Sequence, residues 1–241
     1  MKKLLLSAAA VCTLAFASAA SELAPVWENI VKAPFAEDKA VYNAPVTVDA
    51  AGNVIAAGAF SQDITIGDAT LEAIGTSAYI AKYDAAGTVK WAVALSGSAS
   101  IAAIATDADG NVYAAGTFAD EVELGTTSGD AQTITGMMVD GAPTTNRNAS
   151  FIVKYDADGK LAAKQTFIPK NLPELDATGM YFPMDGDVFF HINHLQAEGG
   201  KVYASAIYTG LTESGSAKFA GTYNDPWFGI YYIDLTGAAI F

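Results

Sequence analysis

An internal repeat constrains this sequence more than any other feature. Residues 46–60 recur as residues 104–118 almost position for position, and residues 79–87 recur as residues 151–159. A weaker third copy follows at residues 200–208 and 230–237. A long-period repeat means that one supersecondary unit is used several times in the fold.

Each copy is expected to form β-strands joined by tight turns. The first copy has four short runs of apolar, β-branched and aromatic residues, at 46–48, 54–60, 79–83 and 90–95. Gly52-Asn53 and Gly110-Asn111 occupy the same place in two copies, and both residue types tolerate the positive φ of hairpin turns. No segment shows sustained helical periodicity. The sequence therefore predicts an all-β protein of repeated four-stranded antiparallel sheets.

Two stretches carry a resemblance to a known family. Residues 107–118 read Asp-Ala-Asp-Gly-Asn-Val-Tyr-Ala-Ala-Gly-Thr-Phe, and residues 151–159 read Phe-Ile-Val-Lys-Tyr-Asp-Ala-Asp-Gly. They resemble the repeats of bacterial SBBP-type β-propeller proteins, and the likeness covers most of residues 43–241. The resemblance implies four-stranded propeller blades in a secreted or cell-surface protein. It implies no catalytic residues, because the family has no shared catalytic set.

The copies are too few for a closed propeller, which typically has about four to eight blades. The third copy has Ala197 in place of the turn Asp, and Phe241 aligns with Trp91 at the start of a fourth strand. Residues 27–33 resemble residues 91–97 and could supply such a strand to a neighbouring blade. We expect an open or incomplete ring of about three blades, completed by a longer chain or by association of two chains.

The N-terminus has the features of a signal peptide. Lys2 and Lys3 precede an apolar stretch, and small residues at 17–20 form the cleavage pattern. The stretch is shorter than the about 20 residues of a membrane span, so we expect no transmembrane anchor in the mature chain. The expected organisation is a signal peptide (1–20), an N-terminal strand segment completing a blade (21–42), blade repeat 1 (43–98), blade repeat 2 with a long inserted loop (99–171), and a linker with the degraded blade repeat 3 (172–241).

Charge and cysteine content narrow the choice of partners. The net charge is −13, with 26 acidic and 13 basic residues, which argues against a nucleic-acid partner because phosphate binding needs clustered Lys and Arg. The only cysteine, Cys12, lies in the expected signal peptide. The mature chain would then hold neither disulfides nor thiolate metal sites.

The Asp-rich turns admit a calcium interpretation as well as a structural one. The candidate ligands are Asp107, Asp109 and Asn111 in one turn, and Asp156 and Asp158 in another. An EF-hand loop needs glycine at its sixth place, whereas the glycine here stands at the fourth. Asp-Gly is also a strong hairpin signal. The pattern favours turns.

Other candidate chemistries rest on weaker patterns. His191 and His194 have His-x-x-His spacing, but residues 188–195 read as a strand, where residues three apart point to opposite faces. Zinc is therefore disfavoured. The 26 acidic residues single out no carboxylate pair for glycoside hydrolysis. Aromatic residues near the C-terminus are expected in the core, with sugar stacking as the alternative; they are Tyr223, Trp227, Phe228, Tyr231 and Tyr232.

These patterns favour a non-catalytic function and predict no catalytic, cofactor-binding or metal-binding residues. We expect an exported binding or scaffold module of the bacterial cell envelope, in the periplasm, at the cell surface or outside the cell, with a protein or glycan ligand. Long inserted loops at residues 126–149 and 169–186 are places where binding could be added. A secreted propeller-fold hydrolase or lyase acting on polysaccharide and a surface adhesin-like protein stay open. Self-association through an open sheet edge is also expected.

Overall fold

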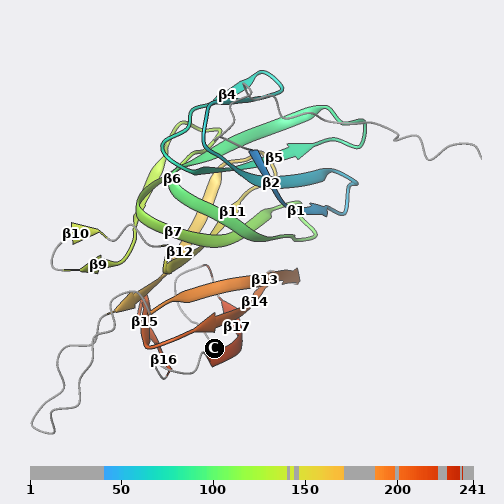
Figure 1. Ribbon diagram of the computed structural model, residues 1–241. Helices are drawn as coiled ribbons and strands as arrows, with labels where there is room; N and C mark the ends of the chain where they lie inside the picture. Colours follow the sequence, from blue (N-terminus) through green and yellow to red (C-terminus); the bar gives the residue numbers. More distant parts are fainter. Residues whose placement is uncertain are drawn as a thin grey trace, which may run out of the picture.

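The fold consists of strands and turns, with no helix among the described residues, which confirms the predicted all-β class. The computed structural model describes residues 41–139, 142–143, 147–170, 188–198, 201–221, 227–233 and 235 (Figure 1). The strands are β1 (Val41–Val48), β2 (Val54–Phe60), β3 (Ile64–Ile66), β4 (Ala69–Leu71), β5 (Ser77–Tyr83), β6 (Val89–Thr106), β7 (Val112–Leu124), β8 (Gln132–Thr135), β9 (Met138–Val139), β10 (Ala142–Pro143), β11 (Ala149–Tyr155), β12 (Leu161–Lys170), β13 (Phe190–Glu198), β14 (Lys201–Tyr208), β15 (Leu211–Ser214), β16 (Ala217–Ala220) and β17 (Trp227–Ile233).

The repeat corresponds to three antiparallel meanders. The first unit comprises β1, β2, β5 and the first part of β6; the second comprises the rest of β6 with β7, β11 and β12. The third unit contains β13, β14 and β17. The first three strands thus follow in the same order in each unit, and a fourth strand is described in the first two. The largest sheet has ten strands and joins the first two units, and none of the described sheets closes on itself.

β6 belongs to two units at once. It pairs with β5 through residues 89–95 and with β7 through residues 95–106. The pairing with β7 is irregular just after Gly97, which has a φ of +131°. A Cβ at Gly97 would lie 2.5 Å from the Glu121 carbonyl oxygen, so only glycine lets the two strands approach here. The expected boundary at residues 98/99 falls inside this strand.

A small hairpin follows the second strand of each unit. The three hairpins are β3–β4, the end of β7 with β8, and β15–β16. The hairpin of one unit also pairs with the last strand of the unit before it. Ser96 of β6 is paired with Glu123, and Ile168 of β12 is paired with Glu213. These two pairs occupy equivalent positions of the repeat, so successive units are joined in the same register.

The two faces of each unit can be distinguished by alternate residues of its second strand. The front face carries Val54, Val112 and Val202 in the three units, and the back face carries Ile55, Tyr113 and Tyr203. Alternation follows from the two-residue period of a strand. The outer strands extend each face, because paired residues on neighbouring strands lie on the same side.

The core is built by stacking the back face of one unit on the front face of the next. A first cluster includes Ile55, Ile80 and Val93 of the first unit with Val112, Phe151 and Tyr155 of the second. A second cluster includes Tyr113, Ile152 and Phe167 of the second unit with Phe190, Ile192 and Val202 of the third. The same back-to-front contact therefore occurs twice, once between each pair of successive units. In Figure 1, β13, β14 and β17 accordingly form a separate layer beside the large sheet.

Candidate functional site

Four aspartate turns are built by the same hydrogen bonds. In each, Oδ1 of the aspartate accepts from the backbone N–H groups two and four residues later. The aspartates are Asp49, Asp84, Asp107 and Asp156. The glycine three residues after each aspartate has a φ between 77° and 86°. The Asp-Gly pattern thus forms Asx-type turns that tie the hairpins.

These hydrogen bonds use the oxygens that a calcium ion would need. Oδ1 of Asp107 accepts from the N–H groups of Asp109 and Asn111, and Oδ2 accepts from the Asn111 amide and the Tyr113 hydroxyl. Calcium takes about six to eight oxygen ligands. Within the described ranges, no group of three or more His, Cys, Asp or Glu side chains is arranged to hold a metal ion.

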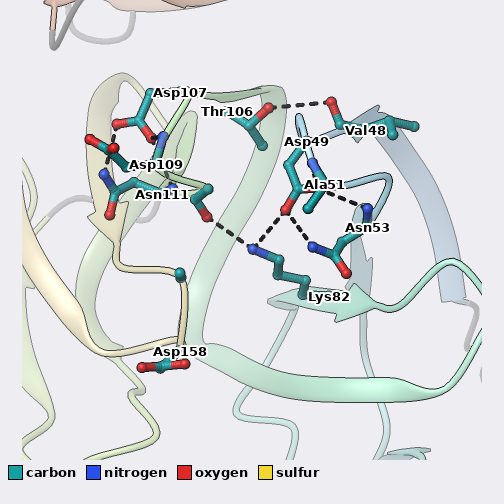
Figure 2. A network of polar contacts seen from close by, with 12 residues as sticks. Val48, Asp49, Ala51, Asn53, Lys82, Thr106, Asp107, Asp109, Asn111 and Asp158 are labelled. Atoms are coloured by element: carbon teal, nitrogen blue, oxygen red, sulfur yellow. Dashed lines mark hydrogen bonds and ion pairs between the residues drawn. The ribbon is translucent and has the colours of Figure 1, made fainter.

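One turn aspartate is held by a buried lysine. Lys82 Nζ lies 2.9 Å from Asp49 Oδ2, and each side chain is only 2% exposed. Lys82 also donates to the Gly110 carbonyl at 2.9 Å, so it links the turns of two units (Figure 2). Burial alone raises the pKa of Asp49, but hydrogen bonds from Asn53 and Lys82 and the lysine charge outweigh it and lower the pKa to about 2.

The second unit satisfies its turn aspartate with a tyrosine instead. The Tyr113 hydroxyl donates to Asp107 Oδ2 at 2.8 Å. Lys154, the equivalent of Lys82, lies over the Tyr113 ring with Nζ 5.3 Å from its centre. Burial alone raises the pKa of Asp107, but the hydrogen bonds from Asn111 and Tyr113 outweigh burial, so the pKa is lowered overall. Burial and the bond to Asp107 both raise the pKa of Tyr113.

A cavity of about 180 Å³ lies where the turns of the first two units meet. Its polar lining comprises Asp49, Asn53, Lys82, Lys90, Asp109 and Asp158. Typical small-molecule sites measure about 300–1,000 Å³, so this cavity has room for water or a small ion rather than a sugar chain. Asp49 is poorly suited to donate a proton, because a general acid needs a raised pKa and this one is lowered.

A bulge brings the two histidines to the same face, so the expectation that they point to opposite faces is wrong. His191 pairs with Ile207 and His194 pairs with Ser205, two residues apart on β14. The extra residue, Asn193, accounts for the difference. His191 Nε2 lies 3.1 Å from the Arg147 carbonyl oxygen. Burial lowers the pKa of His191 more than this contact raises it.

The C-terminal aromatic residues are only partly in the core, which corrects the sequence-based expectation. Tyr231 packs against the second core cluster, whereas Trp227 and Phe228 are exposed and Tyr223 lies outside the described residues. Phe228 lies on the back face of the third unit with Ile230, Tyr203 and Tyr232.

Repeat positions show how unusual this exposure is. Ile230 is the equivalent of Ile80 and Ile152, which are fully buried, yet Ile230 is 71% exposed. On the front face of the first unit, Val46 is 63% exposed, whereas its equivalents Ile104 and Leu195 are 8% and 4% exposed. Among the described residues, the back face of the third unit is therefore apolar and exposed. On the front face of the first unit only the β1 edge is exposed, because Phe60, Tyr79 and Tyr83 are buried against the β3–β4 hairpin.

Several expected features lie outside the described residues. These are the signal peptide at 1–20, the strand segment at 21–42 except for its last two residues, and most of the insertion at 169–186. The insertion at 126–149 is described in part: Ile134 and Met137 are buried. Among the described residues, no helix has the length and apolar character needed to cross a membrane.

No protein-family model matches the chain, and no curated protein shows significant similarity to it. In its described part, the chain is an all-β protein of stacked antiparallel meanders, tied by aspartate turns and with an exposed apolar sheet face on its third unit.

Proposed function

We propose that the chain is an exported β-propeller-repeat protein that acts as a non-catalytic binding or scaffold module of the bacterial cell envelope. The observation that carries this proposal is the exposed back face of the third unit. Phe228 and Ile230 are exposed there, although equivalent positions in the other units are buried. Contiguous exposed apolar surface is a mark of interaction sites.

The propeller part of the proposal is supported by the repeated meanders and their face-to-back stacking. Propeller blades are four-stranded antiparallel sheets, and the first two units have four strands in that order. Export is supported by the signal-peptide pattern of residues 1–20 and by the lack of cysteine after Cys12. The SBBP-type resemblance of residues 107–118 and 151–159 supports both the propeller fold and export.

Binding through a face is favoured over chemistry in a cleft. The cavity between the first two units is too small for a polysaccharide chain, and its buried carboxylate, Asp49, is committed to Lys82. The hydrolase or lyase alternative therefore has no observation in its favour. An apolar and aromatic sheet face suits a protein surface, because such faces gain affinity by excluding water.

Two experiments test the proposal. In cell fractionation, the full chain should reach the envelope fraction, and a chain lacking residues 1–20 should stay in the cytoplasm. In sedimentation with isolated envelopes, the wild type should be retained and Ile230→Lys should be lost to the supernatant. Ile74→Lys is the matched control, because Ile74 is also exposed but lies in the loop between β4 and β5. Equal retention of the two variants would contradict the proposal.

A further inference from the structure

The exposed back face of the third unit and the exposed β1 edge of the first unit's front face occupy the positions that form the two halves of one repeated interface. We propose that copies of this chain assemble head to tail, with the back face of the third unit of one copy packed on the front face of the first unit of the next. This inference deepens the proposed function, on which it rests for its biological meaning, by naming a second copy as the partner of the exposed face.

The first support is that the chain already makes this interface twice within itself. Back face meets front face between the first and second units and again between the second and third. The backbone register is the same at both junctions, with Ser96 paired to Glu123 and Ile168 paired to Glu213. The partner that a back face of this repeat accepts is thus known from the structure.

The second support comes from the residues on the open back face. Tyr203 and Ile230 correspond to Tyr113 and Ile152, which are buried against the front face of the third unit. Neither Tyr203 nor Ile230 is replaced by a charged residue, as would be expected for a face that remains in water. The open face therefore keeps the residue types of a covered one.

The third support comes from the β1 edge of the first unit's front face. Val46 and Val48 of β1 are exposed, while Ile104 and Leu195, the equivalents of Val46, are buried at the internal junctions. The hairpin β3–β4 covers the centre of this face, where Phe60, Tyr79 and Tyr83 are at most 3% exposed. It need not block docking, because the equivalent hairpin residues of the second unit share a cluster with the docked first unit.

A strand edge is available on the same side. In the second and third units, the first strand of the hairpin pairs with the last strand of the preceding unit. Among the described strands, β3 pairs only with β4. Thr65 of β3 is the repeat equivalent of Glu123 and Glu213, which pair with the last strand of the preceding unit. The first unit therefore offers the exposed apolar residues of β1 and the backbone edge of β3 to the junction.

The two faces differ, so the contact is heterologous. Such contacts do not close on a two-fold axis and generate rings or open chains. The net charge of −13 opposes association of copies, and salt screens that repulsion. Assembly through apolar faces should consequently strengthen as salt is raised, whereas an assembly held by ion pairs would weaken.

The test uses purified chain in solution and three variants with the same change of side chain. Ile230→Lys damages the back face, Val46→Lys damages the front face, and Ile74→Lys is the control with similar exposure. All three make the chain less negative, so loss of assembly cannot arise from added repulsion. Melting temperatures close to that of the wild type would show that the variants fold.

Analytical ultracentrifugation at increasing concentration gives the readout. The wild type and Ile74→Lys should form species larger than a dimer, and each face variant alone should be monomeric at a tenfold higher concentration. An equimolar mixture of Ile230→Lys and Val46→Lys should form a one-to-one dimer and nothing larger, because only one intact pair of faces remains.

Three results would overturn the inference. They are a wild type that stays monomeric at the highest concentration and salt, a Val46→Lys variant that still dimerises through its back face alone, and a mixture that gives no dimer. If the purified chain is monomeric while envelope retention still depends on Ile230, the proposed function stands and the partner is another molecule. If assembly occurs without envelope retention, the proposed function fails and the inference stands.

Discussion

Lys82 Nζ lies 2.9 Å from Asp49 Oδ2 in a pair that is almost fully buried, and the same ammonium group reaches the Gly110 carbonyl of the next unit. The pair therefore ties the first turn of one unit to the first turn of another. Thr106 adds a weaker link of the same kind, because its hydroxyl lies 3.4 Å from the Val48 carbonyl oxygen. Stability and the stacking of units are thus coupled at this end of the sheets.

Removing the lysine should strongly destabilise the fold. Lys82→Met leaves Asp49 buried without its cation, and breaking a buried pair in this way costs about 3–5 kcal/mol. Chemical unfolding followed by fluorescence measures the loss. Lys90→Met is the control, because Lys90 lines the same cavity but is exposed, and its change should stay within about 0.5 kcal/mol. A loss below about 1 kcal/mol for Lys82→Met would contradict the assigned role.

The same pair should make stability depend on acid pH. The pKa of Asp49 falls from 3.8 to about 2 on folding, so its contribution is complete above pH 4 and is lost as pH falls toward 2. The shift corresponds to about 2 kcal/mol. The difference in unfolding free energy between wild type and Asp49→Asn should therefore shrink over this interval. A difference that is constant from pH 6 to pH 2.5 would contradict the lowered pKa.

Two turn glycines with the same backbone angle should respond differently to alanine. Gly52 and Gly159 have φ values of +80° and +81°. An added Cβ meets nothing within 4 Å at Gly52 but lies 2.8 Å from the Trp91 ring at Gly159. Gly52→Ala should cost about 1–2 kcal/mol for the backbone alone, and Gly159→Ala about 1–3 kcal/mol more for overpacking. Equal melting temperatures for the two variants would contradict this.

Neighbouring aspartates in one turn should also differ. Oδ1 of Asp156 accepts from the N–H groups of Asp158 and Lys160, so Asp156→Ala should lower stability by about 1–2 kcal/mol. Asp158→Ala removes an exposed side chain at the cavity rim and should change stability by less than about 0.5 kcal/mol. Thermal unfolding of the two variants side by side is sufficient. A larger loss of stability for Asp158→Ala than for Asp156→Ala would contradict the structural role assigned to Asp156.

Local features could be predicted from the sequence because their causes are local. Gly52 and Gly110 mark turns through their own φ, and alternation of small and apolar residues marks strands. The small hairpins have a weaker signal: Ile64-Thr65-Ile66-Gly67 recurs as Val122-Glu123-Leu124-Gly125, a match too short to predict a hairpin by itself.

Features that depend on distant residues could not be predicted. Nothing near Lys82 in the sequence indicates that it reaches Gly110, 2.9 Å away across a unit junction. The strand period places His191 and His194 on opposite faces. The irregularity at Asn193 that brings them to one face depends on pairing with β14. Burial of Ile80 and exposure of Ile230 depend on which unit follows, although the local sequence is similar.

The continuity of β6 has a mechanical consequence. Its backbone runs without a break from the sheet of the first unit into the sheet of the second, and it is hydrogen-bonded to β5 along one part and to β7 along the other. Tension on one unit would pass to the next along this strand, loading its flanking hydrogen bonds in shear rather than extending a slack linker. Under tension, the first two units would therefore behave as one mechanical unit and would not separate from each other easily.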